Sequence, residues 1–237
     1  MNKRISVVIP AYNEERYIEQ CLKSLVNQTV HRDEFEIVVV DGGSADRTVE
    51  LAEEYADVVI QQKSRGVGGA RNDGVEVASA ELVATTDADI LLPSDWLSRI
   101  CAAFEVEDVV AVYGPIDPIE NRRKYRLLIG LFNKLVYVSA RLNAFYATLG
   151  SNTAFRRGAF LQIGGYSDMD AGDDYEIAVR LKRTGTIYYD AKLYVQFSMR
   201  RMEKFGIARA LYIWAINVVA AKRGKKPTVN YMRQQYE

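Results

Sequence analysis

The stretch Glu81–Trp96, ELVATTDADILLPSDW, decides how the rest of the chain is interpreted. Its first part, Leu82–Thr86, is short, apolar or β-branched and bounded by polar residues, which predicts a buried β-strand. Asp87 and Asp89 follow directly. On an extended backbone residues i and i+2 project to the same side, so the two carboxylates are expected to converge at the tip of the strand.

Two ionised carboxylates at one point repel each other, and a hard divalent cation removes that conflict. Mg²⁺ or Mn²⁺ typically lies between carboxylates and substrate phosphates. The pair therefore predicts a metal site at Asp87 and Asp89. The alternative is two solvated aspartates in a turn, ahead of a helix that begins near Pro93–Ser94, and the neighbouring motifs must decide between the two.

The composition limits the class of protein. With 237 residues, 49% hydrophobic and 26% charged, the chain is expected to form one domain, or one domain with an appendage. Its formal net charge of zero predicts no nucleic-acid partner. Cys21 and Cys101 are expected to be core residues of a reducing compartment. The sequence shows no basic-then-apolar leader, and its apolar run Ala210–Ala221 is shorter than the ~20 residues of a spanning helix. Both observations predict a cytoplasmic location.

Strands and helices alternate up to Asp89. Strands are predicted at Arg4–Pro10, Phe35–Val40, Val58–Gln61 and Leu82–Thr86, and helices at Glu15–Asn27, Arg47–Tyr55 and Ala70–Ala78. This order is typical of a mostly parallel, Rossmann-like α/β sheet, in which ligands bind outside the carboxyl ends of the strands. Polar loops fall at three such ends: Ala11–Glu14, Asp41–Ser44 and Asp87–Asp89. Their coincidence favours the metal-site interpretation of the two aspartates.

A glycine-rich loop is predicted at Ser64–Asn72, with Arg65 and Arg71 as contacts to phosphate or base. The alternative is a plain turn with solvated arginines. Arg71 occupies the place of the third glycine of a dinucleotide fingerprint, which disfavours a dehydrogenase.

The second half continues the pattern and adds charged residues. Strands are predicted at Val109–Gly114, Thr153–Phe155, Ile187–Asp190 and Tyr194–Phe197, and helices from Ser94 to Glu105, at Gly158–Ile163 and at Tyr175–Thr184. Asp173 and Asp174 enter the last of these helices. A carboxylate held at a helix start is well placed as a general base, although acids there also suit the helix dipole. Arg200 and Arg201 either reach a diphosphate or are solvated.

Two further helices mix basic and large apolar residues. Arg122–Phe145 is too basic for a core helix and too apolar for a surface helix, and Phe205–Ala221 ends in the basic run Lys222–Lys226. Two interpretations are possible for each helix: it packs on the domain, or it lies in a membrane interface. If Arg122–Phe145 packs on the domain, it would line an acceptor groove.

Five motifs in this order resemble those of inverting family 2 glycosyltransferases with the GT-A fold. They are Val8–Glu14 (VIPAYNE), Val39–Thr48 (VVDGGSADRT), Gly69–Asn72 (GARN), Asp87–Asp89 (DAD) and Asp173-Asp174. The similarity runs from about Ser6 to about Arg201, which is most of the chain. It implies one GT-A domain at residues 1–203, made of a nucleotide-sugar-binding half (1–90) and an acceptor half (91–203), with a helical extension at 204–237.

The resemblance, together with the arginines of the glycine-rich loop and with Arg200 and Arg201 considered above, predicts roles for individual residues. Those expected to bind the donor, a UDP- or GDP-sugar, are Pro10, Ala11, Tyr12, Glu14, Asp41, Ser44, Arg65, Arg71, Asp87, Arg200 and Arg201. Asp87 and Asp89 are expected to bind Mg²⁺ or Mn²⁺. Asp174 is the expected catalytic base, and Asn152 and Asp173 are expected on the acceptor side.

The chain departs from the family in two places. Asp173 replaces the usual glutamate, and Gln196–Met202 lacks the Gln-x-x-Arg-Trp motif of processive members, so transfer of a single sugar is expected. The acceptor is expected to be a saccharide or lipid-linked, with the protein at most peripheral to the cytoplasmic face of a membrane. A nucleotidyltransferase would carry a glycine-rich signature with a lysine after the first strand. An inactive nucleotide-sugar-binding module would have lost a carboxylate, and all the expected ones are present.

Overall fold

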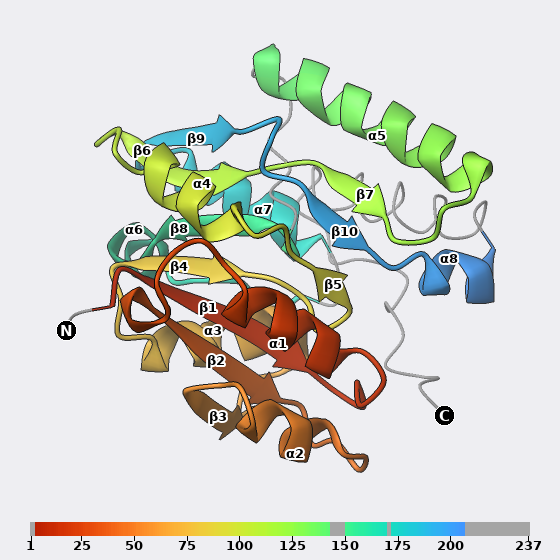
Figure 1. Ribbon diagram of the computed structural model, residues 1–237. Coiled ribbons are helices and arrows are strands. Elements are labelled where there is room, and N and C mark those ends of the chain that lie inside the picture. The colour runs from red at the N-terminus through yellow and green to blue at the C-terminus, as the bar shows by residue number, and fades with distance from the viewer. Residues whose placement is uncertain (1–2, 143–149, 170–171, 207–237) are drawn as a thin grey trace.

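A central sheet of seven strands, in the order β3-β2-β1-β4-β8-β6-β9, organises the molecule (Figure 1). The computed structural model describes residues 3–142, 150–169 and 172–206. The strands of this sheet are β1 (Ile5–Ala11), β2 (Phe35–Asp41), β3 (Val58–Gln61), β4 (Leu82–Thr85), β6 (Val109–Tyr113), β8 (Thr153–Arg156) and β9 (Thr186–Tyr189). Only β8 runs antiparallel to its neighbours, β4 and β6. The mostly parallel α/β sheet predicted from the sequence is confirmed.

A second, three-stranded sheet in the order β5-β10-β7 lies beside the first. It is formed by β5 (Ile90–Leu91), β7 (Ile116–Pro118) and β10 (Val195–Phe197). β10 falls within the strand predicted at Tyr194–Phe197, whereas β5 and β7, of two and three residues, were not predicted. Segments this short show no clear hydrophobic period. β5 is nevertheless important for the site, since its pairing with β10 ends the loop that carries Asp87 and Asp89.

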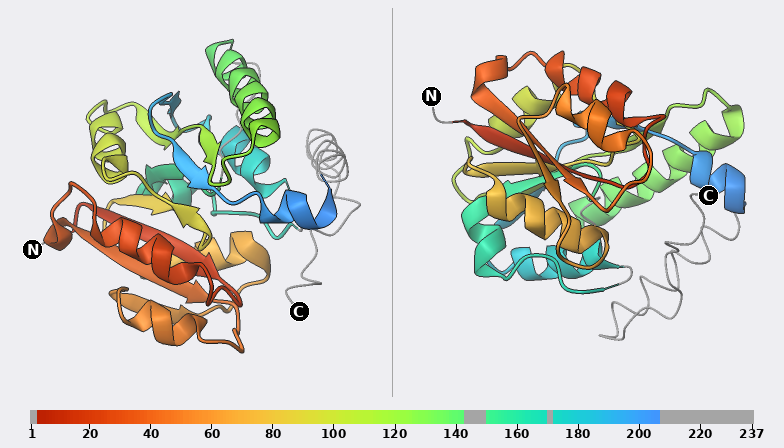
Figure 2. Two further views of the ribbon diagram at one scale, coloured as in Figure 1. Left: turned by 45° about the vertical axis from the view of Figure 1, so that its right-hand side comes forward. Right: turned by 90° about the horizontal axis from the view of Figure 1, so that it is seen from below.

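Helices cover both faces of the central sheet (Figures 1 and 2). They are α1 (Ile18–Val26), α2 (Thr48–Glu53), α3 (Gly66–Val77), α4 (Trp96–Ala103), α5 (Arg123–Arg141), α6 (Arg157–Gln162), α7 (Asp173–Leu181) and α8 (Arg200–Phe205), with a 3₁₀ turn at Arg32–Glu34. Helices α1, α2 and α4 share one apolar core with the sheet, whereas α3, α6 and α7 share the other. Helix α5 contributes to both cores.

The two cores follow from the alternation of side chains along the strands. Ile5, Val7 and Ile9 of β1 point to the first core and Val8 to the second, and all four are fully buried. Burying each such side chain stabilises the fold by about 1.5–3 kcal/mol. Both cysteines are buried, as predicted, and they form no disulfide with each other.

Helix α3 begins earlier than predicted, at Gly66, so the glycine run forms its first turns rather than a loop. Within this helix, the Asp73 carboxylate accepts hydrogen bonds from the Lys63 and Ser64 backbone N–H groups (2.6 and 2.9 Å). These bonds fold the preceding segment back on the helix. A Cβ at Gly69 would lie 2.8 Å from Ser64, so only glycine permits this approach.

Some predictions fall outside the described residues. The predicted helix over 122–145 is found as α5, and its last residues, 143–145, are outside. Helix α8 ends at Phe205, where the second mixed helix was predicted to begin, and residues 207–237 are outside the description.

Candidate active site

The carboxyl ends of β1, β2 and β4 meet at one edge of the sheet, because the three strands are parallel neighbours. The loops that follow them carry most of the predicted site residues. Pro10 and Ala11 end β1, and Tyr12 begins the first loop with 43% of its surface exposed. Arg65 is exposed and immediately precedes α3.

The first and second loops are joined by hydrogen bonds. The Asn13 N–H donates to Ser44 Oγ (2.9 Å), and the Ala45 N–H donates to Asn13 Oδ1 (2.9 Å). The buried Asp41 carboxylate accepts from the Gly43 and Ser44 N–H groups (3.0 Å each) and from Ser44 Oγ (2.5 Å). Asp41 and Ser44, predicted separately as donor contacts, are therefore one bonded unit that shapes the second loop.

Asp87 and Asp89 do not lie on an extended backbone, so that part of the prediction is wrong. β4 ends at Thr85, and Ala88 and Asp89 form a turn closed by the Ile90 N–H, which donates to the Asp87 carbonyl (3.3 Å). The two carboxylates bind different arginines. Asp87 accepts from Arg71 (2.9 Å), and the buried Asp89 lies 2.9 Å from Arg200.

Arg71 lies among three carboxylates. Its side chain is 5% exposed, and its guanidinium lies 2.9 Å from Asp87, 3.6 Å from Asp174 and 3.9 Å from Asp173. It also lies over the ring of Tyr166, 5.6 Å from the centroid. Burial alone would lower the pKa of Arg71, but the nearby acidic groups outweigh it and raise the pKa. One buried cation thus joins the turn after β4 to the start of α7, residues far apart in the sequence.

Asp173 and Asp174 form the first turn of α7, after Gly172 with φ +79°. Burial raises the pKa of both carboxyl groups. Asp173 raises the pKa of Asp174 further, while Arg71 opposes the shift. Asp174 Oδ1 is buried against Arg71, yet 40% of the side chain is exposed. A carboxyl group with a raised pKa and access to solvent is suited to proton transfer.

Gly150 packs against this cluster and was not predicted. A Cβ there would collide with the Arg71 guanidinium and the Asp174 carboxylate. Its carbonyl accepts from Thr85 Oγ1 (2.7 Å), which ties it to the end of β4. Asn72 adds a second tie, since its side chain exchanges two hydrogen bonds with the Tyr166 backbone (2.8 and 2.9 Å). Nothing in the sequence pattern marked Gly150, whereas Asn72 follows Arg71 in the quoted GARN motif.

Arg200 joins the first loop to the turn after β4. Its Nη2 lies 2.5 Å from the buried Glu14 and 2.9 Å from Asp89. The guanidinium also lies over the Tyr17 ring, 4.3 Å from the centroid, a contact that the sequence did not indicate. Arg201 lies in α8, and its side chain is outside the description.

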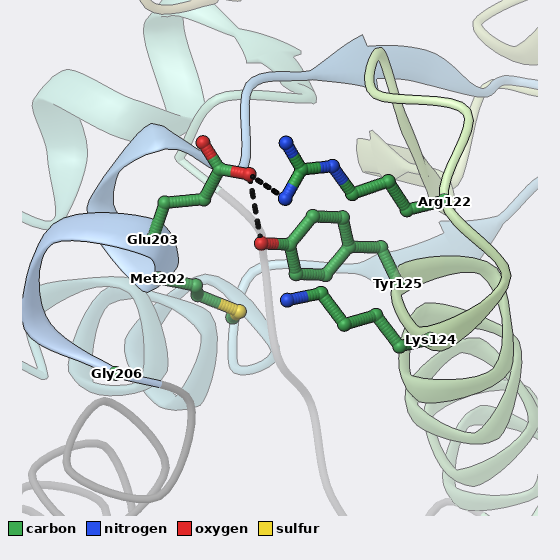
Figure 3. Close-up of a pocket in the computed structure, with 6 residues that line it drawn as sticks. All are labelled: Arg122, Lys124, Tyr125, Met202, Glu203 and Gly206. Carbon is green, nitrogen blue, oxygen red and sulfur yellow. Dashed lines mark hydrogen bonds and ion pairs between the residues drawn. The ribbon is translucent and has the colours of Figure 1, made fainter.

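Contacts at its start and at Glu203 hold helix α8 in place. Glu120 accepts from the Met199 N–H (2.9 Å) at the start of the helix. Glu203 accepts from the Tyr125 hydroxyl (2.9 Å) and pairs with Arg122 (3.0 Å), across a pocket of about 460 Å³ between α8 and α5 (Figure 3). These bonds fix the helix that presents Arg200.

Asn152 does not lie at a surface where an acceptor would bind. It is fully buried, accepts from Trp96 Nε1 (2.9 Å) and donates to the Pro115 and Leu193 carbonyls (3.0 and 2.7 Å). Its amide therefore joins α4 to the segments around β7 and β10, which is a structural role.

Asn152→Ala is expected to lower the free energy of unfolding by about 2 kcal/mol, because buried partners are left without hydrogen bonds. Urea unfolding measures it. Asn121→Ala is the control, since that asparagine is exposed. A stable variant with an increased acceptor KM would instead support the acceptor role predicted from the sequence.

The donor set of Asp87 and Asp89 fits a hard cation of the Mg²⁺ or Mn²⁺ type. No group of three or more metal-binding side chains is present among residues 3–142, 150–169 and 172–206. Such cations are commonly held by one or two carboxylates together with substrate phosphates, so two aspartates are sufficient once a diphosphate is bound.

Comparison with known proteins identifies the family. The chain matches "Glycosyl transferase family 2" over residues 6–164. It is 39% identical over 116 residues to the putative glycosyltransferase EpsH of Bacillus subtilis (strain 168), covering 46% of this chain and 33% of that protein. It is 31% identical over 175 residues to a glucosyl-dolichyl phosphate glucuronosyltransferase of Haloferax volcanii, covering 69% of this chain and 56% of that protein. The chain thus spans a third to about half the length of these two relatives.

Solved structures share the fold. The mannosyltransferase PcManGT from Pyrobaculum calidifontis has a TM-score of 0.72 at 24% identity, covering 93% of this chain and 63% of that chain. Glucosyl-3-phosphoglycerate synthase from Mycobacterium tuberculosis has a TM-score of 0.67 at 20% identity, covering 94% and 78%. With the GT-A architecture in common and the family match over most of the sheet, the chain belongs to glycosyl transferase family 2.

Proposed function

We propose that the chain is an inverting, metal-dependent, non-processive glycosyltransferase. It moves one sugar from a UDP- or GDP-sugar to an acceptor hydroxyl or a lipid-linked acceptor. The observation that carries this proposal is the position of Arg71, which holds Asp87 within reach of Asp173 and Asp174. A donor-phosphate site and a base must lie this close for a single displacement.

The donor is proposed to lie across the ends of β1, β2 and β4. Residues Pro10–Glu14 with Asp41 and Ser44 would hold the base and ribose. Asp87 and Asp89 would hold the cation, which neutralises charge on the diphosphate when bound. Arg200, and Arg201 beside it, would stabilise the departing nucleoside diphosphate electrostatically once the donor draws Arg200 from Glu14 and Asp89.

Asp174 is proposed to take the proton from the acceptor hydroxyl as that oxygen attacks the anomeric carbon from the face opposite the leaving group. Its raised pKa brings it nearer to the ideal for a base at neutral pH. Asp173 and Arg71 position it. A lipid phosphate acceptor is already ionised and would need this base less.

Known proteins of the same fold support the donor class. The PcManGT structure contains GDP-Man and Mn²⁺, and the mycobacterial synthase structure contains Mn²⁺, UDP and phosphoglyceric acid. The name of the Haloferax relative contains glucosyl-dolichyl phosphate, a lipid-linked sugar, which supports a lipid-linked acceptor.

A donor screen tests the proposal. Calorimetry with UDP, GDP, CDP and their sugar conjugates, with and without Mn²⁺, is expected to show metal-dependent binding of one nucleoside diphosphate. Binding without any transfer would support an inactive binding module. No binding by folded protein would overturn the donor assignment.

Asp89→Ala is expected to weaken donor binding in Mn²⁺ by about tenfold or more, because one of the two carboxylates that hold the cation is lost, and loss of a partner that only supports a metal ligand already costs about 10–100-fold. The same calorimetry in EDTA should show little difference from wild type. Asp95→Ala is the control, an aspartate that is half exposed, immediately precedes α4 and is bound to Arg99 of that helix. Unchanged affinity of Asp89→Ala in Mn²⁺ would remove the metal assignment.

A further inference from the structure

Helix α5 turns a stripe of large apolar side chains to solvent. Leu127, Leu131 and Leu135 are 66%, 60% and 62% exposed, and Val138 and Leu142 continue the stripe with 43% and 70%. Residues three or four apart lie on one side of a helix, so these five form one continuous surface, here called the leucine stripe. Contiguous exposed apolar surface of this kind marks an interaction site.

The same helix is strongly basic. It carries five exposed cations and no acidic residue between 123 and 141: Arg123, Lys124, Arg126, Lys134 and Arg141. Arg123 lies one turn from Leu127, and Lys134 and Arg141 lie three residues beyond Leu131 and Val138. The leucine stripe is therefore bordered by positive charge along its length.

The opposite side of α5 fastens the helix to the domain. Tyr125, Ile129 and Val136 are buried. The Asn133 side chain accepts from the Ile116 N–H (3.2 Å) and donates to its carbonyl (2.7 Å). The helix lies along the outside of the molecule (Figure 1), so the stripe is held outward by the fold.

We propose that the leucine stripe of α5 docks on an anionic lipid bilayer, lying in the interface without crossing it. Apolar side chains bordered by lysine and arginine match an acyl boundary covered by negative headgroups. None of the helices in the described ranges is long and apolar enough to span a membrane. The docking follows from this surface alone and does not depend on the proposed reaction.

Charge disfavours two other partners for the leucine stripe, namely a second copy of the chain and residues 207–237. A second copy packed stripe to stripe would bring the two sets of cations together, which is unfavourable. Residues 207–237 of the same chain carry six Lys or Arg and a single acid, Glu237, so they complement the basic border no better. A surface with many negative headgroups is the complementary partner.

Vesicle sedimentation tests the proposal with the full chain. Wild type is expected to sediment with phosphatidylglycerol-containing vesicles, more weakly with phosphatidylcholine alone, and less in high salt. A triple variant, Leu127→Gln, Leu131→Gln and Leu135→Gln, is expected to reduce the partition coefficient about tenfold or more. The matched control is Val77→Gln, Val106→Gln and Leu161→Gln, three exposed apolar residues outside α5. It should bind as wild type.

A fluorescent probe identifies the surface directly. Both native cysteines are buried, so Leu131→Cys can be labelled selectively with an environment-sensitive dye. Its emission is expected to shift to shorter wavelength when anionic vesicles are added, while the same dye on Val106→Cys should not shift.

A blue-shifted dye in dilute, lipid-free protein would show that residues 207–237 cover the stripe. A shift that needs high protein concentration would show a second copy. Either result, or equal binding by wild type and the triple variant, overturns the proposal.

Discussion

Asp174→Asn is expected to bind the donor as wild type does and to transfer sugar to a hydroxyl acceptor about 10²–10⁴-fold more slowly. The loss follows from geometry and charge. Asp174 begins α7, lies 3.6 Å from Arg71 and has a pKa raised by burial and by Asp173. Asparagine keeps the size of the side chain and can accept a hydrogen bond from Arg71, but it cannot take a proton.

Pre-steady-state kinetics measure the rate of sugar transfer, and calorimetry measures donor affinity. The wild-type rate should fall as the pH is lowered through the raised pKa of Asp174, because the base must be deprotonated. That acidic limb should be absent from the residual activity of Asp174→Asn. Asp95→Asn serves as the control for a lost carboxylate elsewhere. Full activity in Asp174→Asn would point to a phosphate acceptor or to another base.

The central strands could be predicted because parallel strands buried on both faces are apolar throughout. Every residue of β2 is buried, and β1 is buried except for Pro10, which is half-buried. The meeting of the loops that follow these strands could also be predicted, because parallel neighbouring strands have their carboxyl ends at the same edge of the sheet. The mixed composition of α5 was also informative, because one side of the helix is buried and the other is exposed.

Pairings between distant residues could not be predicted. Asp87 and Asp89 were expected to point to the same side of a strand, but β4 ends at Thr85 and the two residues lie in a loop. That loop ends at β5, which pairs with β10, more than a hundred residues later in the sequence. Arg200 binds Glu14 across 186 residues of sequence, and no local pattern specifies such a partner. Asn152 has the polarity of an acceptor contact, and its burial depends on three segments that meet only in the folded chain.

Arg71→Met is expected to lower the free energy of unfolding by about 3–5 kcal/mol, because it removes the buried cation and leaves three carboxylates close together. Methionine keeps much of the side-chain volume, so the loss reports charge rather than a cavity. Urea unfolding measures it. Arg157→Met is the matched control, a half-buried arginine that donates to the Val75 and Glu76 carbonyls (3.0 and 3.1 Å) and has no carboxylate partner there.

The pH dependence separates charge from packing. Burial already raises the pKa of Asp173 and Asp174, and Arg71 holds both values down. Without Arg71 both should rise further. An acid whose pKa is higher in the folded than in the unfolded state favours folding at low pH and opposes it as the pH rises through the folded value. The deficit of Arg71→Met should therefore be larger at about pH 8 than at about pH 5, while that of Arg157→Met stays constant. A deficit independent of pH would mean that Arg71 acts through packing, and the electrostatic link between the turn after β4 and α7 would have to be abandoned.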